Sequence, residues 1–358
     1  MIDHGDGGGA VLLHAGWRGL LRAPVVGALP LLLAAGLAAC EAAPVAAPAA
    51  PPPAPAGTPG TGTGTLHQPD GQSFYVSDRT AAARRFTELR AQGRTAEAEA
   101  IARLAGAPSA HWLVGGDDRA AVEELSRAAT AAGRTALFVA YNIPQRDCGS
   151  FAAGGAPDAA SYRAWVDALS AGLADRRAWV VLEPDAVPHA LDGCGPKGTD
   201  VAERYALLAY AVAELKRHPR VRVYLDAGNA GWAQDRTALV DALNRSGIGQ
   251  ADGFAVNVAN FYGTEQSASY GAGLSAALGG KHFVIDTSRN GRGPLGSGAW
   301  CNPPGRAVGE TPTERTGRPG VDAYLWVKIP GESDGDCGRG EPGAGQFWLD
   351  YALGLAAR

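Results

Sequence analysis

From about residue 66 onward, short apolar runs alternate with longer stretches in which apolar residues recur every three or four positions. The short runs predict buried strands, and the three-to-four-residue period predicts amphipathic helices. We expect seven strands, at His111–Val114, Ala136–Ile143, Ala178–Glu183, Val221–Leu225, Gly253–Val258, His282–Asp286 and Ala323–Ile329. We expect helices near 80–105, 118–132, 158–175, 200–217, 234–245, 266–278 and 346–356.

Strands that alternate with helices indicate βα units. Because every strand is an apolar run, the pattern favours an α/β fold in which a parallel sheet closes into a barrel rather than staying open. The carboxyl ends of the strands converge in such a barrel, and active sites form there. Polar or aromatic clusters follow six of the strands: Tyr141-Asn142, Glu183–Asp185, Asp226–Asn229, Asn257–Asn260, Asp286–Arg289 and Lys328–Asp334. One strand that ends in Asp is explained by helix capping, but six such ends predict an active-site cleft on this face.

The N-terminal region has the layout of an export signal. Arg18 and Arg22 precede an apolar run that ends in small residues at Cys40, and this run is too short to span a membrane comfortably. The segment Leu37-Ala38-Ala39-Cys40 resembles a bacterial lipobox, which implies cleavage before Cys40 and a lipid on its sulfur. An ordinary signal peptide cleaved nearby is the alternative. We therefore expect a signal peptide at 1–39 and a protein that is exported, either as a lipoprotein on the outer face of the cell membrane or secreted.

The next segment, 40–65, is rich in Pro, Ala, Gly and Thr and predicts an extended tether in front of a catalytic domain at 66–358. The net charge is −4, with acidic and basic residues well mixed. We therefore expect no nucleic-acid partner, and no membrane contact except through a lipid at Cys40. A neutral or polymeric substrate fits this charge better.

Four cysteines fall in the predicted domain, at Cys148, Cys194, Cys301 and Cys337. An even number in an exported chain predicts two disulfides, and three pairings are possible. No closely spaced Cys or His motif is present, so we expect no metal site.

Several segments resemble the signatures of family 6 glycoside hydrolases, the inverting cellulases. They are YNIPQRDC at 141–148, LEPDAV at 182–187, DAGNAGW at 226–232, FVIDTSRNGRG at 283–293, AWCNPPGRAVG at 299–309 and AYLWVKIPGESDG at 323–335. The motifs occur in order over residues 108–355. The resemblance implies a distorted seven-stranded β/α barrel that hydrolyses β-1,4-glucan or cello-oligosaccharides and needs no cofactor.

The resemblance also assigns roles to the carboxylates. Asp185 matches the general acid, and its place after a wholly apolar strand independently favours its protonated form. Asp147 matches the carboxylate that keeps this acid protonated. Asp334 matches the candidate base, which acts directly or through a chain of waters, and Arg289 and Lys328 match cations that keep it ionised.

Substrate contacts follow from the same comparison. Tyr141 matches an aromatic residue that crowds the sugar at the cleavage point, and the remaining candidates are Trp112, Trp232, Trp300, Asn229, Lys328 and Glu332. Aromatic rings suit this role because the axial C–H face of glucose is apolar. We expect Trp165, Trp179, Trp326 and Trp348, which fall within predicted helices and strands, to be packing residues.

The family pattern pairs Cys148 with Cys194 and Cys301 with Cys337. One departure concerns Ala152, which stands where endoglucanases of the family carry a serine that helps relay water. The compact segments between motifs favour a monomeric, endo-acting enzyme with an open cleft. A chain-end cellobiohydrolase and a non-catalytic glycan-binding protein are the alternatives, the latter prompted by Ala152.

Overall fold

The computed structural model describes residues 71–357, apart from 196–198, 233–234 and 297. The predicted signal peptide, Cys40 and the tether lie outside the described residues. Within the described part, no helix combines the length and the apolar character needed to cross a membrane.

Seven parallel strands lie side by side in chain order, as the sequence predicts. They are β1 (His111–Leu113), β2 (Ala136–Ala140), β3 (Ala178–Leu182), β4 (Val221–Asp226), β5 (Gly253–Val256), β6 (His282–Asp286) and β7 (Val321–Leu325). The sheet curls into a distorted barrel, but no strand ladder joins β1 to β7 among the described residues. Ala110 N–H donates across this gap to the Trp326 carbonyl at 3.0 Å. The barrel is therefore not fully closed by strand pairing, where we expected closure.

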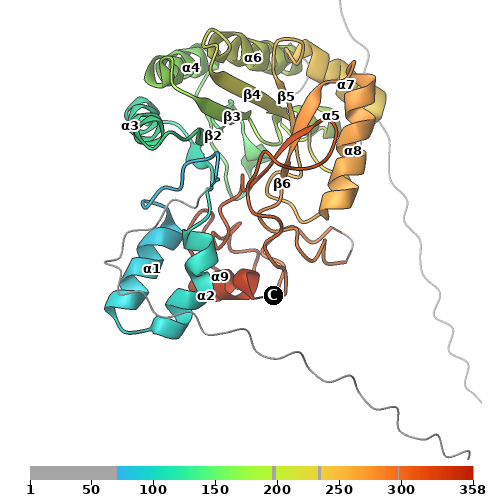
Figure 1. The fold of residues 1–358 in the computed structure, drawn as a ribbon. Helices are drawn as coiled ribbons and strands as arrows, with labels where there is room; N and C mark the ends of the chain where they lie inside the picture. The colour runs from blue at the N-terminus through green and yellow to red at the C-terminus, as the bar shows by residue number, and fades with distance from the viewer. Residues whose placement is uncertain (1–70, 196–198, 233–234, 297, 358) are drawn as a thin grey trace, which may run out of the picture. The chain divides into compact units, whose positions relative to one another are not determined.

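Helices cover the outside of the sheet (Figure 1). These helices are α3 (Asp118–Ala131), α4 (Ala159–Leu173), α5 (Ala186–Asp192), α6 (Thr199–Leu215), α7 (Arg236–Arg245) and α8 (Thr264–Ala277). A second group packs together apart from them and consists of α1 (Ala81–Ala91), α2 (Thr95–Ala105) and α9 (Leu349–Ala356). The indole of Trp326, which follows β7, is fully buried in this second group.

The expected single helix at 80–105 is wrong, because the chain forms two helices there. Gly93 adopts a left-handed φ of 71° between α1 and α2, a conformation that glycine tolerates and that ends the first helix. Helix α5 and a short 3₁₀ turn at Asp147–Gly149 were not predicted either. The turn lies in the loop after β2 and begins with Asp147, and α5 lies in the loop after β3 and begins directly after Asp185.

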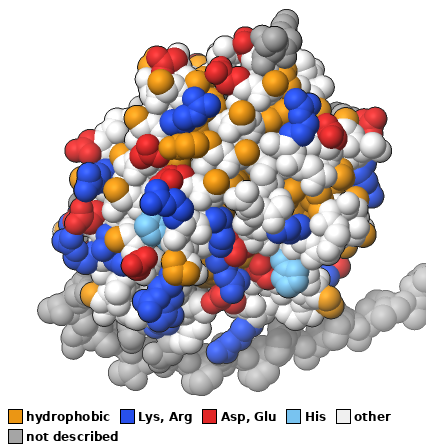
Figure 2. All heavy atoms as spheres, turned by 90° about the horizontal axis from the view of Figure 1, so that it is seen from above, with side chains coloured by type: hydrophobic (Ala, Val, Ile, Leu, Met, Phe, Trp, Pro, Cys, Tyr) orange, Lys and Arg blue, Asp and Glu red, His pale blue; other side chains and the backbone are white. Residues whose placement is uncertain are grey.

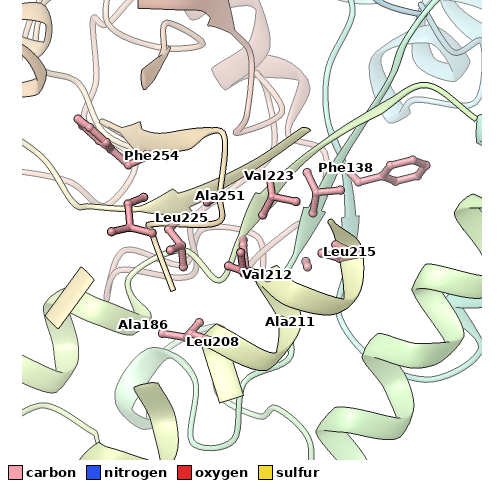
Figure 3. Close-up of a cluster of buried hydrophobic side chains, with 14 of the residues drawn as sticks. Phe138, Ala186, Leu208, Ala211, Val212, Leu215, Val223, Leu225, Ala251 and Phe254 are labelled. Atoms are coloured by element: carbon pink, nitrogen blue, oxygen red, sulfur yellow. The ribbon is translucent and has the colours of Figure 1, made fainter. Parts of the chain in front are cut away.

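The main core lies between the sheet and the outer helices. Figure 3 shows Val223 and Leu225 of β4 beside the apolar side of α6, which supplies Leu208, Ala211, Val212 and Leu215, with Phe138 and Phe254 of the same cluster to either side. A smaller apolar cluster fills the barrel interior. The sheet is thus packed on both sides, which explains why its strands read as continuous apolar runs.

Several predicted strands extend too far at their carboxyl ends, and buried carboxylates explain this. Asn142 N–H and Ile143 N–H donate to the carboxylate of Glu183 instead of to a neighbouring strand. Val327 N–H and Lys328 N–H donate in the same way to Asp286. The apolar Ile143 and Val327 prolong the strand pattern in the sequence, but the backbone has already left the strand ladder there.

Candidate active site

Strained backbone gathers at the carboxyl ends of the strands. Apart from Ala174, the described non-glycine residues with positive φ all follow strands β2, β3, β5, β6 or β7: Gln145, Asp147, Cys148, Glu183, Asp185, Asn257, Ala259, Asn302 and Cys337. Such conformations cost free energy and persist only where the surroundings enforce them, which is typical of functional sites. The backbone therefore marks the same face that the sequence predicted.

Asp185 follows β3 and lies against Asp226 at the end of β4. Its backbone N–H donates to Oδ2 of Asp226 at 2.8 Å, and Gly228 N–H donates to the same oxygen at 3.2 Å. Burial raises the pKa of Asp185 well above the ordinary value, and the negative charges of Asp226 and Asp147 raise it further. The pKa of Asp226 is also raised, chiefly by burial. Asp185 is thus set to carry a proton near neutral pH.

This arrangement revises part of the sequence reasoning. Asp147 was expected to keep Asp185 protonated, yet the charge of Asp226 contributes more to the raised pKa of Asp185. From sequence, Asp226 belongs to one of the strand-end clusters but has no assigned role. It bonds backbone groups, and one of them belongs to the candidate acid.

Asp147 begins the short turn after β2 and is partly exposed. Its Oδ2 accepts a hydrogen bond of 2.6 Å from the backbone N–H of Ala152, so the loop folds back on the carboxylate. The next residue, Cys148, forms the expected disulfide with Cys194. His189 of α5 lies 2.7 Å from the Cys148 sulfur. The disulfide thus joins the loops after β2 and β3.

Asp334 lies between two cations after β7. Arg289 Nη1 donates to its Oδ2 at 2.7 Å, and Lys328 Nζ is 3.5 Å from its Oδ1. Burial would raise the pKa of Asp334, but the charges of Arg289 and Lys328 outweigh burial, and the pKa lies below its ordinary value. The surroundings therefore favour the ionised form of Asp334 and the protonated form of Asp185.

Asn302 also contacts Asp334, and sequence reasoning missed it. Its backbone N–H donates to Oδ2 of Asp334 at 3.0 Å. It follows Cys301, whose disulfide with Cys337 is the second expected pair. Asn302 lies within the quoted segment AWCNPPGRAVG, but its contact with Asp334 spans 32 residues and is not visible in that local pattern.

Two predicted aromatic residues lie together at the gap between β1 and β7. The indole Nε1–H of Trp112 donates to the Val327 carbonyl at 2.8 Å, and its ring meets Tyr141 edge to face at 5.3 Å. Trp112 is partly exposed, whereas Tyr141 is buried. Burial and the charge of Asp185 raise the pKa of Tyr141, so its hydroxyl stays protonated and can donate a hydrogen bond.

Trp232 lies in the loop after β4. Its indole N–H donates to Asp192 Oδ2 at 3.1 Å, and its ring packs on His189 at 5.1 Å. Asn229 in the same loop is buried, and its Oδ1 accepts from Gly231 N–H at 3.0 Å. Asn229 therefore shapes this loop, which leaves its amide NH₂ as the group for any sugar contact.

Trp300 is about half exposed, in the long segment between β6 and β7. Its ring centroid is 6.1 Å from that of Phe151, which is equally exposed and lies in the loop after β2. Phe151 also covers Gly335, where an added Cβ would come within 2.4 Å of the Phe151 ring. Phe151 was not predicted as a site residue, although an exposed aromatic beside Asp147 is a signal that sequence reasoning had available.

Glu332 lies close to the partly buried Lys328, and burial raises the pKa of its carboxyl to about 7. Together with Trp112, it lines a pocket of about 720 Å³ that reaches Arg79 and Arg84 near the start of α1. The predicted packing role of Trp165, Trp179 and Trp326 is confirmed, because all three are buried.

The site thus combines a protonated carboxyl at Asp185 with an ionised carboxylate at Asp334. Two carboxyl groups whose surroundings move their pKa values in opposite directions can act as an acid and a base at one pH. Figure 2 views the domain from the side of α4 and α6 in Figure 1, and on that face acidic and basic side chains are interspersed without a field of one charge sign. This chemistry suits a neutral substrate.

Comparison with known proteins gives a consistent result. The model of the family described as glycosyl hydrolases family 6 matches residues 69–358. Endoglucanase A of Cellulomonas fimi is 44% identical over 260 residues, which are 72% of this chain and 55% of that protein. A 1,4-β-D-glucan cellobiohydrolase of Pyricularia oryzae is 34% identical over 288 residues, which are 67% of this chain and 58% of that protein. The chain thus spans little more than half the length of these two relatives.

Among solved structures, the endoglucanase Cel6 from Mycobacterium tuberculosis is similar over most of the domain. The TM-score is 0.75 with 42% sequence identity, and the match covers 80% of this chain and 97% of that one. That structure holds methyl-cellobiosyl-4-deoxy-4-thio-β-D-cellobioside. From the family match and these similarities, the chain belongs to glycosyl hydrolase family 6.

Proposed function

We propose that this protein hydrolyses internal β-1,4-glucosidic bonds of cellulose or a related β-glucan, with inversion at the anomeric carbon. The observation that carries the proposal is that Asp185 lies buried beside Asp226 while Asp334 lies between Arg289 and Lys328, so that their pKa values shift in opposite directions on one face of a family 6 barrel. An inverting glycosidase needs this division, because one carboxyl group must give a proton while the other takes one.

In the proposed reaction, Asp185 transfers its proton to the glycosidic oxygen as the bond from that oxygen to the anomeric carbon breaks. A water attacks the anomeric carbon from the opposite face and loses a proton to Asp334, directly or through a second water. One water is consumed for each bond broken. Asp226 and Asp147 support the acid, because their negative charges favour the protonated form of Asp185.

Substrate binding is assigned to the aromatic residues around these carboxylates. Trp112, Trp232 and Trp300 each keep part of their surface exposed, which suits stacking on the apolar face of glucose. Tyr141 is proposed to crowd the sugar at the cleavage point, and Asn229, Lys328 and Glu332 to bond sugar hydroxyls. The relatives named as an endoglucanase and the thio-oligosaccharide complex support this substrate class.

The proposal is tested on carboxymethylcellulose and cellohexaose with the wild type and Asp185→Ala. We expect viscosity to fall rapidly relative to the release of reducing ends, and the variant to lose about 10²- to 10⁴-fold in kcat. Asp192→Ala is the matched control, because this carboxylate bonds Trp232 at the edge of the same site. The control is expected to change substrate binding far more than kcat.

Other outcomes decide between the alternatives. Release of cellobiose with little fall in viscosity would indicate chain-end action, as in the cellobiohydrolase relative. Binding of cellohexaose without turnover would indicate a glycan-binding protein. Ala152 would then be the first position to restore to serine, since its backbone N–H bonds Asp147 but its side chain has no hydroxyl.

We further propose that the protein is exported and held at the cell membrane by a lipid on Cys40, with residues 40–65 as a tether. Metabolic labelling with a fatty acid tests this in the full chain. Incorporation in the wild type and its loss in Cys40→Ser is the expected result, and labelling unchanged by the substitution would contradict it.

A further inference from the structure

Asn302 occupies an unusually constrained place in the loop that leads to β7. It is 2% exposed and adopts a left-handed φ of 43°, so its conformation must be enforced by its neighbours. Its side-chain Oδ1 accepts a hydrogen bond of 2.7 Å from the backbone N–H of Asp334. Its own backbone N–H donates to Oδ2 of Asp334 at 3.0 Å. The two residues therefore hold each other through a reciprocal pair of hydrogen bonds.

The amide NH₂ of Asn302 fixes which way its side chain faces. It lies 2.8 Å from the Gly335 carbonyl and 3.0 Å from Oε2 of Glu341, and both of these atoms only accept. Arg339 holds Glu341 in place through hydrogen bonds of 2.9 Å. If the amide flipped, its oxygen would face two acceptors and its NH₂ would face the N–H of Asp334. The observed orientation is therefore the stable one.

The two oxygens of Asp334 consequently have different surroundings. Oδ2 accepts two hydrogen bonds, one from Arg289 Nη1 at 2.7 Å and one from the Asn302 N–H at 3.0 Å. Oδ1 has Lys328 Nζ at 3.5 Å, beyond the 2.7–2.9 Å that is typical of a charge-assisted hydrogen bond. Lys328 thus supplies positive charge without occupying this oxygen closely.

We propose that Asn302 is a positioning residue for Asp334. It keeps Oδ2 of Asp334 hydrogen-bonded within the protein, so that Oδ1 accepts the proton of the attacking water. The inference rests on the proposed function, since it names the working atom of the proposed base. Without Asn302, the carboxylate is free to rotate toward Lys328 and to engage Oδ1 in a close ion pair. The base would keep its charge but lose its alignment with the water.

The first test variant is Asn302→Gly, because glycine tolerates the left-handed φ. It removes the side-chain oxygen that holds the Asp334 N–H and the amide that anchors this loop, which together keep the Asn302 N–H on Oδ2. The matched control is Ser170→Ala. Ser170 is also buried, and its hydroxyl bonds Glu214 and His218 between α4 and α6, away from the carboxyl ends of the strands. Both variants are expected to lower Tm. Only Asn302→Gly is expected to reduce kcat on cellohexaose, by about 10- to 100-fold with KM within twofold of the wild type.

A second variant, Asn302→Asp, keeps the size of the side chain and adds a negative charge beside Asp334. The new charge is expected to raise the pKa of Asp334, so the acidic limb of the kcat–pH profile moves to higher pH. This readout remains decisive if the glycine variant does not fold. A side chain at position 302 that does not adjoin the titrating base would leave that limb in place, and the contact on which the proposal rests would then be wrong.

The proposal is overturned if Asn302→Gly folds and keeps kcat within twofold of the wild type while Asp334→Ala is inactive. An acidic limb that stays in place in Asn302→Asp would overturn it as well. Wild-type kcat in Asp334→Ala is a different failure, because it removes the proposed base itself and with it the mechanism.

Discussion

The backbone N–H of Asp185 donates to Oδ2 of Asp226 at 2.8 Å, while Oδ1 of Asp226 is buried and has no hydrogen-bond partner among the described residues. A carboxylate in this position is poorly solvated, and it lies beside a second carboxyl group. Both features favour protonation of the pair. The candidate acid is thus set up by a neighbour that contacts its backbone and also raises its pKa.

Replacing Asp226 with Asn is expected to lower the pKa of Asp185, because the substitution removes a negative charge but keeps an oxygen for the Asp185 N–H. The alkaline limb of the kcat–pH profile should move to lower pH, since the acid then loses its proton earlier. Asp252→Asn is the control, because Asp252 accepts from Lys216 and Val223 at the opposite end of the sheet. A limb that moves equally in both variants, or in neither, contradicts this account.

Lys328→Gln is expected to shift the acidic limb of the kcat–pH profile. Lys328 helps to hold the pKa of Asp334 below its ordinary value, so its removal lets that pKa rise. The acidic limb of the kcat–pH profile should move to higher pH, because the base must be ionised to act. Lys216→Gln, which breaks an ion pair with Asp252 remote from the site, should leave the limb in place. An unchanged limb in Lys328→Gln would remove Asp334 from the role of base.

The stability of the fold is expected to fall as pH rises from 5 to 8. Burial raises the pKa of Glu183 to about 7, whereas its ordinary value is 4.5. The folded state holds this proton more tightly than the unfolded chain does. The resulting stabilisation is fully present below about pH 4.5 and is lost as the pH rises through about 7. Each such proton changes the free energy of unfolding by about 1.4 kcal/mol per pH unit.

Glu183→Gln should therefore show a shallower decline when the free energy of unfolding is measured by urea titration at several pH values. Glu99→Gln, an exposed residue paired with Arg90, is the control and should follow the wild type. Identical slopes for all three proteins would mean that Glu183 does not titrate in this range.

Leu208→Ala is expected to lower the free energy of unfolding by about 2–5 kcal/mol, because it leaves a cavity between α6 and the sheet. Leu295→Ala, at a position that is 39% exposed, should change it by less than about 0.5 kcal/mol. Thermal and urea unfolding measure both. Equal effects at the two positions would show that the region in Figure 3 is not the core of the domain.

The sequence predicted the order of the strands and their parallel arrangement because apolar runs are local signals. An apolar run of five residues followed by Glu-Pro-Asp identifies both β3 and the place of Asp185. The strand ends were less predictable, because the N–H groups of Asn142 and Ile143 bond Glu183, about 40 residues away. No periodicity reveals that a side chain has replaced a neighbouring strand.

Contacts between residues far apart in the chain also explain why the sequence did not point to Asn302. Asn302 is important through a partner 32 residues away, and its left-handed backbone has no signature in its own sequence. The expected helix at 80–105 failed for a different reason. A single glycine within a helical period is often tolerated, so the pattern alone does not tell that Gly93 ends a helix.

The most direct test of the central claim is ¹H NMR of the anomeric protons during early hydrolysis of cellohexaose, with Asp185→Ala and Asp334→Ala measured beside the wild type. An inverting enzyme with Asp185 as acid predicts that the new reducing ends appear first as the α-anomer and equilibrate later, and that both variants lose turnover. Products that appear first as the β-anomer would contradict inversion, and wild-type turnover in Asp185→Ala would contradict the assignment of the acid.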